Sequence, residues 1–360
     1  MNPDAKRFGR GTKFISVMDI LNNQFICYDN IRASVEVMDG DIDTYGVNYG
    51  DILFQRSSET LEDVGQANVY LDSKPAIFGG FVIRGKSKGN YNPLFFRYLL
   101  ASPTARKRII VKGAGAQHFN IGQDGLSKVS LDIPCMQEQK KIGELLQCID
   151  ARIATQNKII EDLKKLKSAI VDKLYSSTNG KTYSFCQLFE VVNEKNKKLA
   201  YKNVLSASQE LGMIERSNIN IDIKFEQESI SGYKIVRKGD YVVHLRSFQG
   251  GFAFSDTTGI CSPAYTILRP NDLVVYGYLS HFFTSKPFIK SLKLVTYGIR
   301  DGRSINVDEW LDMPILLPSA QEQMRILTIV NAIDAKLHNE AKVQFCLSSQ
   351  KSYLLNTMFI

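Results

Sequence analysis

The feature that most constrains this chain is an internal repeat with a period near half its length. Ile133-Pro134-Cys135-Met136-Gln137-Glu138-Gln139 returns 184 residues later as Leu317-Pro318-Ser319-Ala320-Gln321-Glu322-Gln323. Farther upstream, Gly50-Asp51-Ile52-Leu53 resembles Gly239-Asp240-Tyr241-Val242. A period of this kind means that each structural unit occurs twice. The predicted order is therefore globule, helix, globule, helix.

The segments that follow the two copies of the motif have the seven-residue spacing of a paired helix. Eight of ten spaced positions are apolar in the first segment: Ile142, Leu146, Ile149, Ile153, Ile160, Leu163, Ile170 and Leu174. Seven of ten are apolar in the second: Ile326, Val330, Ile333, Leu337, Leu347, Leu354 and Met358. Each segment begins just after a proline, which suits a helix start. A helix of about 40 residues would extend about 60 Å at 1.5 Å per residue.

Helices this long cannot be buried in an ordinary domain, so the simplest cover for each apolar seam is the other helix. A whole globule separates them in sequence, which favours an antiparallel pair. Polar residues interrupt the seams at matching places, Gln156 with Glu340 and Lys167 with Lys351. Either Gln156 and Glu340 make a contact that sets the register, or each lies on a solvated edge.

The globules combine strand-like and helix-like segments in no regular alternation. Strands are predicted at 50–55, 76–84, 239–245 and 264–268, from their β-branched and aromatic content, with short helices at 92–100 and 276–283. A doubly wound nucleotide-binding sheet is not indicated. The predicted fold class is α+β: two mixed domains separated by two long helices that pair as an antiparallel coiled coil.

Charge favours an anionic partner, and nothing indicates a membrane or a metal. Lysine and arginine number 45 against 37 acids, with clusters at 106–108 and 195–202. This excess is compatible with nucleic acid, although a solvated basic face is an open alternative for each cluster. The N-terminus has no apolar signal core, so a cytoplasmic location is expected. The six cysteines form no Cys-x-x-Cys pair, which predicts reduced thiols and no bound metal.

Three motifs resemble catalytic ones but lack the chemistry. Residues 80–87 fit the phosphate-loop expression, yet bulky strand-forming residues fill the loop and a turn follows it. Ser262-Pro263-Ala264-Tyr265 is a poor match to an amino-methyltransferase loop, and Gly113-Ala114-Gly115 follows a strand-like segment, 108–111, without a downstream acid. His118, His244, His281 and His338 are scattered singly. No catalytic residue is predicted.

The pattern as a whole resembles the specificity subunit of type I restriction–modification enzymes. Two globules alternate with two helices, and each helix begins at a Pro-x-x-Gln-Glu-Gln motif. An Ile-Asp pair follows in each helix, at Ile149-Asp150 and Ile333-Asp334. The resemblance covers nearly the whole chain. It implies a non-catalytic subunit with two target-recognition domains, each of which reads one half of a split, asymmetric site in double-stranded DNA.

The resemblance also implies an organisation and partners. The first recognition domain is expected at 1–135, the first helix at 136–176, the second domain at 177–318 and the second helix at 319–360. The helices would act as a spacer and dock two adenine-N6 methyltransferase subunits, which restriction subunits join. S-adenosylmethionine, ATP and Mg²⁺ belong to those partners, and no cofactor is expected in this chain.

One departure concerns the first domain. Only 49 residues precede Gly50-Asp51, against roughly 60 between the first helix and Gly239-Asp240. The usual opening strand of this domain is therefore expected to be trimmed or absent.

Phosphate contacts should supply most of the affinity, and a few side chains should reach base edges. The loops before each Gln-Glu-Gln helix and the turns after the early strands supply the candidates: Arg56, Lys112, Gln117 and His118 in the first domain, and Arg246, Tyr297, Arg300 and Arg303 in the second. Arginine suits guanine and glutamine suits adenine. For any one of them, a structural or phosphate-only role is the alternative.

The candidate residues for the coiled coil and for docking are the two Gln-Glu-Gln motifs and the early apolar positions of each helix. Two other functions compete with DNA reading. The chain could be a coiled-coil scaffold with two globular heads that binds proteins, or a self-sufficient methyltransferase. DNA binding by the subunit with its partner separates the first from DNA reading, and methylation by the chain alone would reveal the second.

Overall fold

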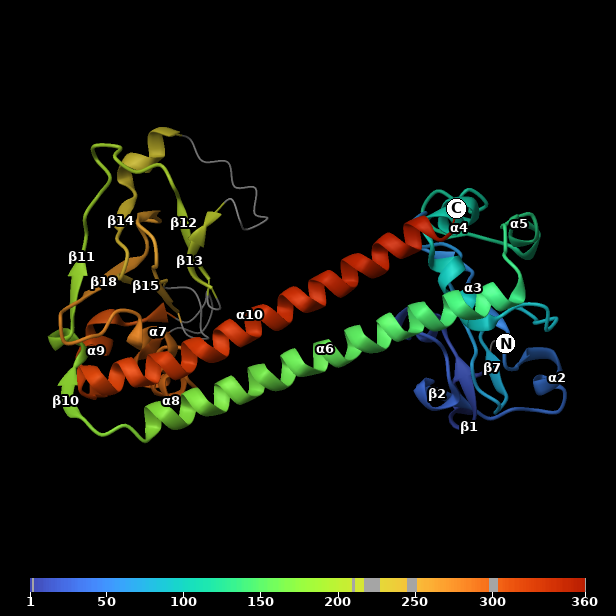
Figure 1. Ribbon diagram of the computed structural model, residues 1–360, viewed down its shortest axis with the longest axis horizontal. Coiled ribbons are helices and arrows are strands. Elements are labelled where there is room, and N and C mark those ends of the chain that lie inside the picture. Colours follow the sequence, from blue (N-terminus) through green and yellow to red (C-terminus); the bar gives the residue numbers. More distant parts are fainter. Residues whose placement is uncertain (2, 209–210, 217–226, 245–250, 298–303, 360) are drawn as a thin grey trace. The chain divides into compact units, whose positions relative to one another are not determined.

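A computed structural model describes residues 1, 3–208, 211–216, 227–244, 251–297 and 304–359. The chain forms two compact units: unit 1 comprises Met1–Lys158 with Ala341–Ile360, and unit 2 comprises Ile159–Glu340. Each unit contains one globule and one end of each long helix (Figure 1). Each compact unit therefore combines a globule with the helix ends that pack on it. The domain boundaries inferred from the sequence stay a prediction.

The two long helices are present as single elements. Helix α6 spans Met136–Ser176, with 41 residues, and α10 spans Ala320–Thr357, with 38 residues. All twenty positions of the two seven-residue series are buried or half-buried. The predicted apolar seams are therefore confirmed.

The helices run antiparallel within each unit. In unit 1, Ile142 and Leu146 near the start of α6 pack in one cluster with Phe359, just after the end of α10. In unit 2, Val171 near the end of α6 packs in one cluster with Ile326 near the start of α10. An early part of one helix meets a late part of the other in both cases, as the sequence predicts.

The lysines that interrupt the seams form ion pairs across the helix pair. Asp150 and Lys351 are 2.6 Å apart in unit 1, and Lys167 and Asp334 are 2.5 Å apart in unit 2. The two aspartates differ by 184 positions, as do the two lysines. Each polar interruption is thus matched to the acid of the Ile-Asp motif on the other helix. The contact predicted between Gln156 and Glu340 would join unit 1 to unit 2 and stays a prediction.

Unit 1 contains three sheets, ordered β2-β1-β7-β3, β6-β4-β8 and β5-β9, in which only β1 and β7 pair in parallel. Its strands are β1 (Phe8–Ile15), β2 (Ala33–Val35), β3 (Gly46–Val47), β4 (Ile52–Gln55), β5 (Ser57–Ser58), β6 (Ala67–Val69), β7 (Ala76–Phe78), β8 (Val82–Gly85) and β9 (Phe119–Asn120). Its short helices are α1 (Val17–Asn22), α2 (Asp41–Tyr45), α3 (Pro93–Ala101), α4 (Pro103–Ile110) and α5 (Gln123–Ser127).

Unit 2 is built around the sheet β11-β18-β15-β16, with the two-stranded sheets β10-β21, β12-β13, β14-β17 and β19-β20. Its strands are β10 (Lys181–Ser184), β11 (Phe189–Val192), β12 (Leu205–Ser208), β13 (Gly212–Glu215), β14 (Lys234–Val236), β15 (Tyr241–Val243), β16 (Phe252–Phe254), β17 (Gly259–Cys261), β18 (Thr266–Pro270), β19 (Thr296–Tyr297), β20 (Ser304–Ile305) and β21 (Pro314–Leu317). Its short helices are α7 (Tyr278–Phe282), α8 (Lys286–Ser291) and α9 (Val307–Leu311).

The Gly-Asp motif marks the same turn in both globules. Gly50 and Gly239 have φ of +88° and +97°, a left-handed conformation that favours glycine. The carboxylates of Asp51 and Asp240 are buried, and each accepts a hydrogen bond from the backbone N–H three residues earlier. The turn leads into β4 in unit 1 and into β15 in unit 2. The upstream part of the repeat is therefore structural.

Sheet β6-β4-β8 matches the strands β16, β15 and β18 of unit 2, but it differs at one edge. In unit 2 the outer side of β18 carries β11, whereas among the described residues of unit 1 no strand pairs with the outer side of β8. Unit 1 does open with a strand, β1, which pairs in another sheet, so the expectation of a trimmed or absent opening strand stays a prediction.

One local prediction was wrong. Residues 108–111 read as strand-like, but Arg108 lies in α4 and Val111 caps its end. The helix starts at Ser102-Pro103, where the Ser102 side chain accepts a hydrogen bond from the N–H of Ala105. A serine cap followed by proline is a strong helix start, and it outweighs the β-branched residues Ile109 to Val111.

The third residue of each Gln-Glu-Gln motif fastens the helix to its own globule. In unit 1, Gln139 is 2% exposed, its amide donates to the carbonyl of Pro134, and its oxygen accepts from the N–H of Asn92. In unit 2, Gln323 is 1% exposed and accepts from the N–H of Val275. These glutamines were proposed for partner docking or the coiled coil; their burial gives them an internal role instead.

Each ion pair between the helices also meets one side chain of the globule. The Tyr98 hydroxyl donates to Asp150 at 2.8 Å in unit 1. In unit 2, Nε2 of His281 lies 3.9 Å from a carboxylate oxygen of Asp334. The two buried glutamines accept from the N–H groups of Asn92 and Val275, which are 183 positions apart and therefore correspond in the two globules. Tyr98 and His281 are also 183 positions apart, so they occupy corresponding positions. A tyrosine in unit 1 thus has a titratable histidine as its counterpart in unit 2.

We predict that unit 2 loses stability in mild acid and that His281→Tyr removes part of this loss. Burial lowers the pKa of His281 and Lys167 lowers it further, whereas Asp334 and Asn331 raise it. A depressed pKa means that the unfolded chain binds the proton more readily, so the stabilisation is complete above about pH 6.5 and is lost as the pH falls through the folded-state pKa.

The measurement can be confined to unit 2, because the only tryptophan of the chain, Trp310, is fully buried there. Its fluorescence during thermal unfolding should show a larger drop in midpoint between about pH 7.5 and 5.5 for the wild type than for His281→Tyr. His118→Tyr, at an exposed position, is the control. Equal acid sensitivity in all three proteins would contradict the prediction.

Candidate nucleic-acid interface

The four residues predicted to contact DNA in unit 1 are all exposed: Arg56, Lys112, Gln117 and His118. Gln117 and His118 lie in a loop closed by two backbone hydrogen bonds of 2.9 Å between Ala114 and Asn120. The closure holds the loop ends together, so the intervening side chains project from a fixed base. This is a suitable arrangement for reading a ligand surface.

Arg56 belongs to the same surface as this loop. Strands β5 and β9 pair Ser57 with Asn120 and Ser58 with Phe119. The carbonyl of Arg56 accepts a 2.9 Å hydrogen bond from the N–H of Ile121. The backbone of Arg56 therefore lies next to the loop that contains His118, 62 positions later in sequence, although the two side chains line different cavities. Lys112, which follows α4, precedes the loop.

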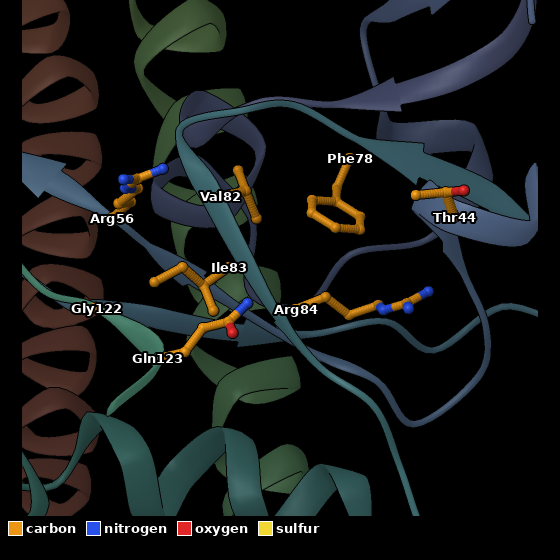
Figure 2. Close-up of a pocket in the computed structure, with 8 residues that line it drawn as sticks. All are labelled: Thr44, Arg56, Phe78, Val82, Ile83, Arg84, Gly122 and Gln123. Carbon is orange, nitrogen blue, oxygen red and sulfur yellow. The ribbon is translucent and has the colours of Figure 1, made fainter. Parts of the chain in front are cut away.

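A cavity of about 520 Å³ lies beside Arg56, lined also by Thr44, Phe78, Val82, Ile83, Arg84, Gly122 and Gln123 (Figure 2). Arg84 runs along one side toward Thr44 and Phe78, and Arg56 lies on the other side. The Arg84 guanidinium donates to the carbonyl of Gly46 and lies 5.5 Å from the centre of the Phe78 ring. Two cations and the amide of Gln123 thus line one hollow.

A second cavity, of about 580 Å³, lies next to His118, and most of its lining residues are polar. It is lined by Leu21, Gln55, Ser57, Ser58, Glu59, Thr60, Asp63, Gln66 and His118. Gln55 is 6% exposed, and its side-chain oxygen has no hydrogen-bond partner among the described residues. The amide of Gln55 donates to the carbonyl of Ser57. Hydroxyls and amides can both donate to and accept from base edges, and they can donate to phosphate oxygens.

The sequence missed several of these polar residues. Arg84 lies in β8, inside the segment that was considered and rejected as a phosphate loop, and Gln123 begins α5. Arg84 lies near Arg56 because β8 pairs with β4, with Gln55 opposite Val82, and Gln123 lies near it because the N–H of Ile121 donates to the carbonyl of Arg56. A pairing between distant strands leaves no local signal in the sequence.

In unit 2, only one of the four residues predicted to contact DNA lies within the described residues. Arg246, Arg300 and Arg303 lie outside the described residues, and Tyr297 lies in β19. The basic cluster at 195–202 is described: Lys195, Lys197, Lys198 and Lys202 are all exposed. Asn196 anchors this loop, because it is 1% exposed and its side chain bonds both the N–H and the carbonyl of Tyr201.

The helices expose apolar residues outside the seams. In unit 1 these are Leu145, Val343, Phe345 and Tyr353, and in unit 2 they are Ile159, Leu166 and Met324. Gln137, Glu138 and Gln321 are exposed and Glu322 is half-buried. The carboxylate of Glu322 pairs with Arg325 at 2.6 Å. Among the described residues, no helix is long and apolar enough to cross a membrane.

The sequence matches a family model and two curated proteins that all concern specificity subunits of type I restriction enzymes. A family model described as the type I restriction modification DNA specificity domain matches residues 1–165. The putative type I restriction enzyme MjaX specificity subunit of Methanocaldococcus jannaschii is 24% identical over 352 residues, with 90% of this chain and 80% of the relative covered. The MjaVIII specificity subunit of the same organism is 22% identical over 344 residues, with 87% and 79% covered.

Three solved structures share the fold. A chain from a study of the complex assembly and conformational transition of a type I R-M system matches with a TM-score of 0.58 and 12% identity, covering 90% of this chain and 85% of that one. The S subunit from M. genitalium matches with 0.51 and 14%, covering 99% and 94%. The HsdS subunit from Thermoanaerobacter tengcongensis matches with 0.50 and 13%, covering 91% and 85%. At this identity, the likeness concerns the fold.

Proposed function

The chain belongs to the specificity-subunit family of type I restriction–modification systems, and from this premise we propose that each unit reads one half of a bipartite DNA site. Members of this family are non-catalytic and supply sequence specificity. The observation that carries the proposal is that Arg56, Gln117 and His118 are exposed on neighbouring backbone segments of unit 1 that are fixed by hydrogen bonds.

The chemistry of these residues fits duplex DNA. Arginine and glutamine can each make two hydrogen bonds to one base, with guanine and adenine respectively. Lys112 and the lysines of the 195–202 loop suit phosphates, because an exposed ammonium neutralises charge without reading sequence. The two globules have different residues in their loops, so the two half-sites are expected to differ. An asymmetric recognition sequence follows.

We further propose that each unit docks one adenine-N6 methyltransferase subunit. The exposed apolar residues on the helices, such as Leu145 and Phe345 in unit 1 and Ile159 and Leu166 in unit 2, offer each unit a surface of its own. S-adenosylmethionine would be bound by those partners, and ATP and Mg²⁺ by the restriction subunits that join them. The assembly would work in the cytoplasm, where DNA is accessible.

Single substitutions separate base reading from phosphate contact. Arg56→Ala should reduce discrimination at one base pair by a factor of about 5 to 150, the equivalent of about 1–3 kcal/mol. Lys112→Ala should weaken binding to specific and scrambled duplexes alike. Lys128→Ala, whose ammonium is already paired with Asp124 at 2.6 Å, is the matched control.

The measurement is equilibrium binding of the subunit, purified with its methyltransferase partner, to duplexes that carry the methylated motif or single-base variants of it. The motif itself comes from methylome sequencing with and without the gene. If the assembly shows no preference for any split motif, the scaffold function replaces DNA reading. Unchanged discrimination in Arg56→Ala would remove that residue from the reading surface.

A further inference from the structure

A basic cavity in unit 1 lies outside the reading surface described above. It has a volume of about 520 Å³, and its lining includes Leu21, Glu62, Gln66, Arg97, Arg106 and Lys107. Arg97 comes from α3, and Arg106 and Lys107 come from α4. Three cations and one carboxylate, that of Glu62, therefore line this cavity.

These cations form no ion pair among the described residues, although Asp150 lies near Arg97 and Asp63 lies near Arg106. The neighbouring Arg108, by contrast, pairs with Asp132. Arg97 donates to the carbonyl of Gln24 at 2.6 Å. Arg106 donates to the carbonyls of Glu62 and Val64 at 2.9 and 2.6 Å. Neutral carbonyls therefore orient both guanidinium groups, and nearby carboxylates compensate their charge only in part.

The charge of Arg106 is partly withdrawn from water as well. Its Nη1 is buried and has no hydrogen-bond partner among the described residues. Burial lowers the pKa of both Arg97 and Arg106, and nearby acids offset this only in part. A half-buried guanidinium whose charge is compensated only in part is costly, and an anion at the cavity would offset that cost. The chemistry of the ligand is therefore that of a phosphate or a carboxylate.

The position of the cavity favours a phosphate of DNA. It shares Leu21 and Gln66 with the polar cavity that contains His118, so the basic cavity continues the predicted reading surface. A partner docked identically on both units would need the same residues in each copy of the repeat. The serine caps of α4 and α8, Ser102 and Ser285, differ by 183 positions. At this offset, Ser280 and Ile289 replace Arg97 and Arg106, so unit 2 lacks the guanidinium pair.

We propose that Arg97, Arg106 and Lys107 bind a backbone phosphate of the DNA whose bases are read at Arg56, Gln117 and His118. This proposal rests on the proposed function, because it assumes that unit 1 reads DNA. It adds an anchoring site that carries no sequence information, on the side of the reading surface nearest to α3 and α4. Phosphate contacts of this kind fix the register of a protein on the duplex.

The test is the salt dependence of DNA binding by the subunit purified with its methyltransferase partner. One lost phosphate contact lowers the slope of log affinity against log salt by about 0.9. Arg106→Gln should therefore lower the slope by about one and weaken binding about tenfold or more, equally for the motif duplex and a scrambled duplex. Arg108→Gln, on the same helix but already ion-paired, should leave the slope unchanged.

Lys107→Gln guards against a folding defect, because Lys107 is exposed and its side chain makes no hydrogen bond or ion pair among the described residues. Its slope should fall with that of Arg106→Gln. An unchanged slope in Lys107→Gln and in folded Arg106→Gln would overturn the proposal. So would loss of the methyltransferase partner from either variant, which would assign the cavity to a carboxylate of that partner. Failure of the proposed function looks different, since the wild type itself would then show no sequence preference.

Discussion

A chimera in which residues 183–317 are replaced by the equivalent segment of a relative is expected to methylate a new sequence that keeps one half of the original motif. The segment lies wholly within unit 2. Its ends lie side by side, because β10 and β21 pair antiparallel, with Tyr183 opposite Ile315 and Lys181 opposite Leu317. Exchange at these points leaves both long helices and all of unit 1 unaltered.

The expected effect is large. If only two base pairs of the half-site change, at about 1–3 kcal/mol each, affinity for the original sequence falls by a factor of about 30 or more. Methylome sequencing of a strain that carries the chimera measures the outcome. Co-purification with the methyltransferase partner shows that the chimera is folded. A folded chimera whose motif changes in both halves would contradict independent reading by the two units.

The second large effect is expected from Gln323→Leu. The Gln323 side chain accepts from the N–H of Val275 and donates to the carbonyls of Leu273 and Pro318 at 2.8 to 3.0 Å. Leucine fills a similar volume but leaves three backbone groups, at Val275, Leu273 and Pro318, without this partner. Each lost hydrogen bond costs about 1 kcal/mol, so the loss of three should destabilise unit 2 by about 3 kcal/mol. For a unit of this size, the loss lowers the unfolding midpoint by roughly 6–12 °C.

The repeat supplies matched controls for this substitution. Trp310 reports only on unit 2, so its fluorescence transition should shift in Gln323→Leu. In Gln139→Leu, the equivalent change in unit 1, the tryptophan transition should stay near its wild-type midpoint. Gln321→Leu alters an exposed residue of the same motif and should change little. A Gln323→Leu protein with the wild-type tryptophan transition would show that the buried glutamine does not hold the helix to the globule.

The long-range plan of the fold could be predicted because it repeats. Periodic apolar residues identify α6 and α10, and the 184-residue offset relates the Asp150–Lys351 pair to the Lys167–Asp334 pair. The lysines themselves read only as polar interruptions. Their role could not be predicted, because a heptad pattern gives a seam but not the residue opposite each position. The strand prediction for residues 108–111 was wrong because it considered only those residues, whereas the helix that includes most of them starts earlier, at Ser102-Pro103.

The candidate site was predictable only in part. Arg56, Gln117 and His118 were found because they lie in loops near a recognisable motif, and the pairing of β5 with β9 brings their backbone segments together. Arg84, Gln123 and the basic cavity were missed, because they depend on strand pairing and on packing of α3 and α4. The sequence showed the cluster at 106–108 but not that Arg108 is paired while Arg106 forms no ion pair among the described residues.

One buried cluster of unit 1 can form only after most of the chain has been synthesised. Phe359 packs with Phe95, Ile142 and Leu146 in a single buried cluster. The first globule is synthesised before α10. This cluster is therefore complete only after Phe359, just beyond the end of α10, has been synthesised. Until then the nascent chain exposes an apolar patch that chaperones can bind. Products of premature termination would keep that patch uncovered, which would mark them for proteolysis before they could compete for the methyltransferase partner.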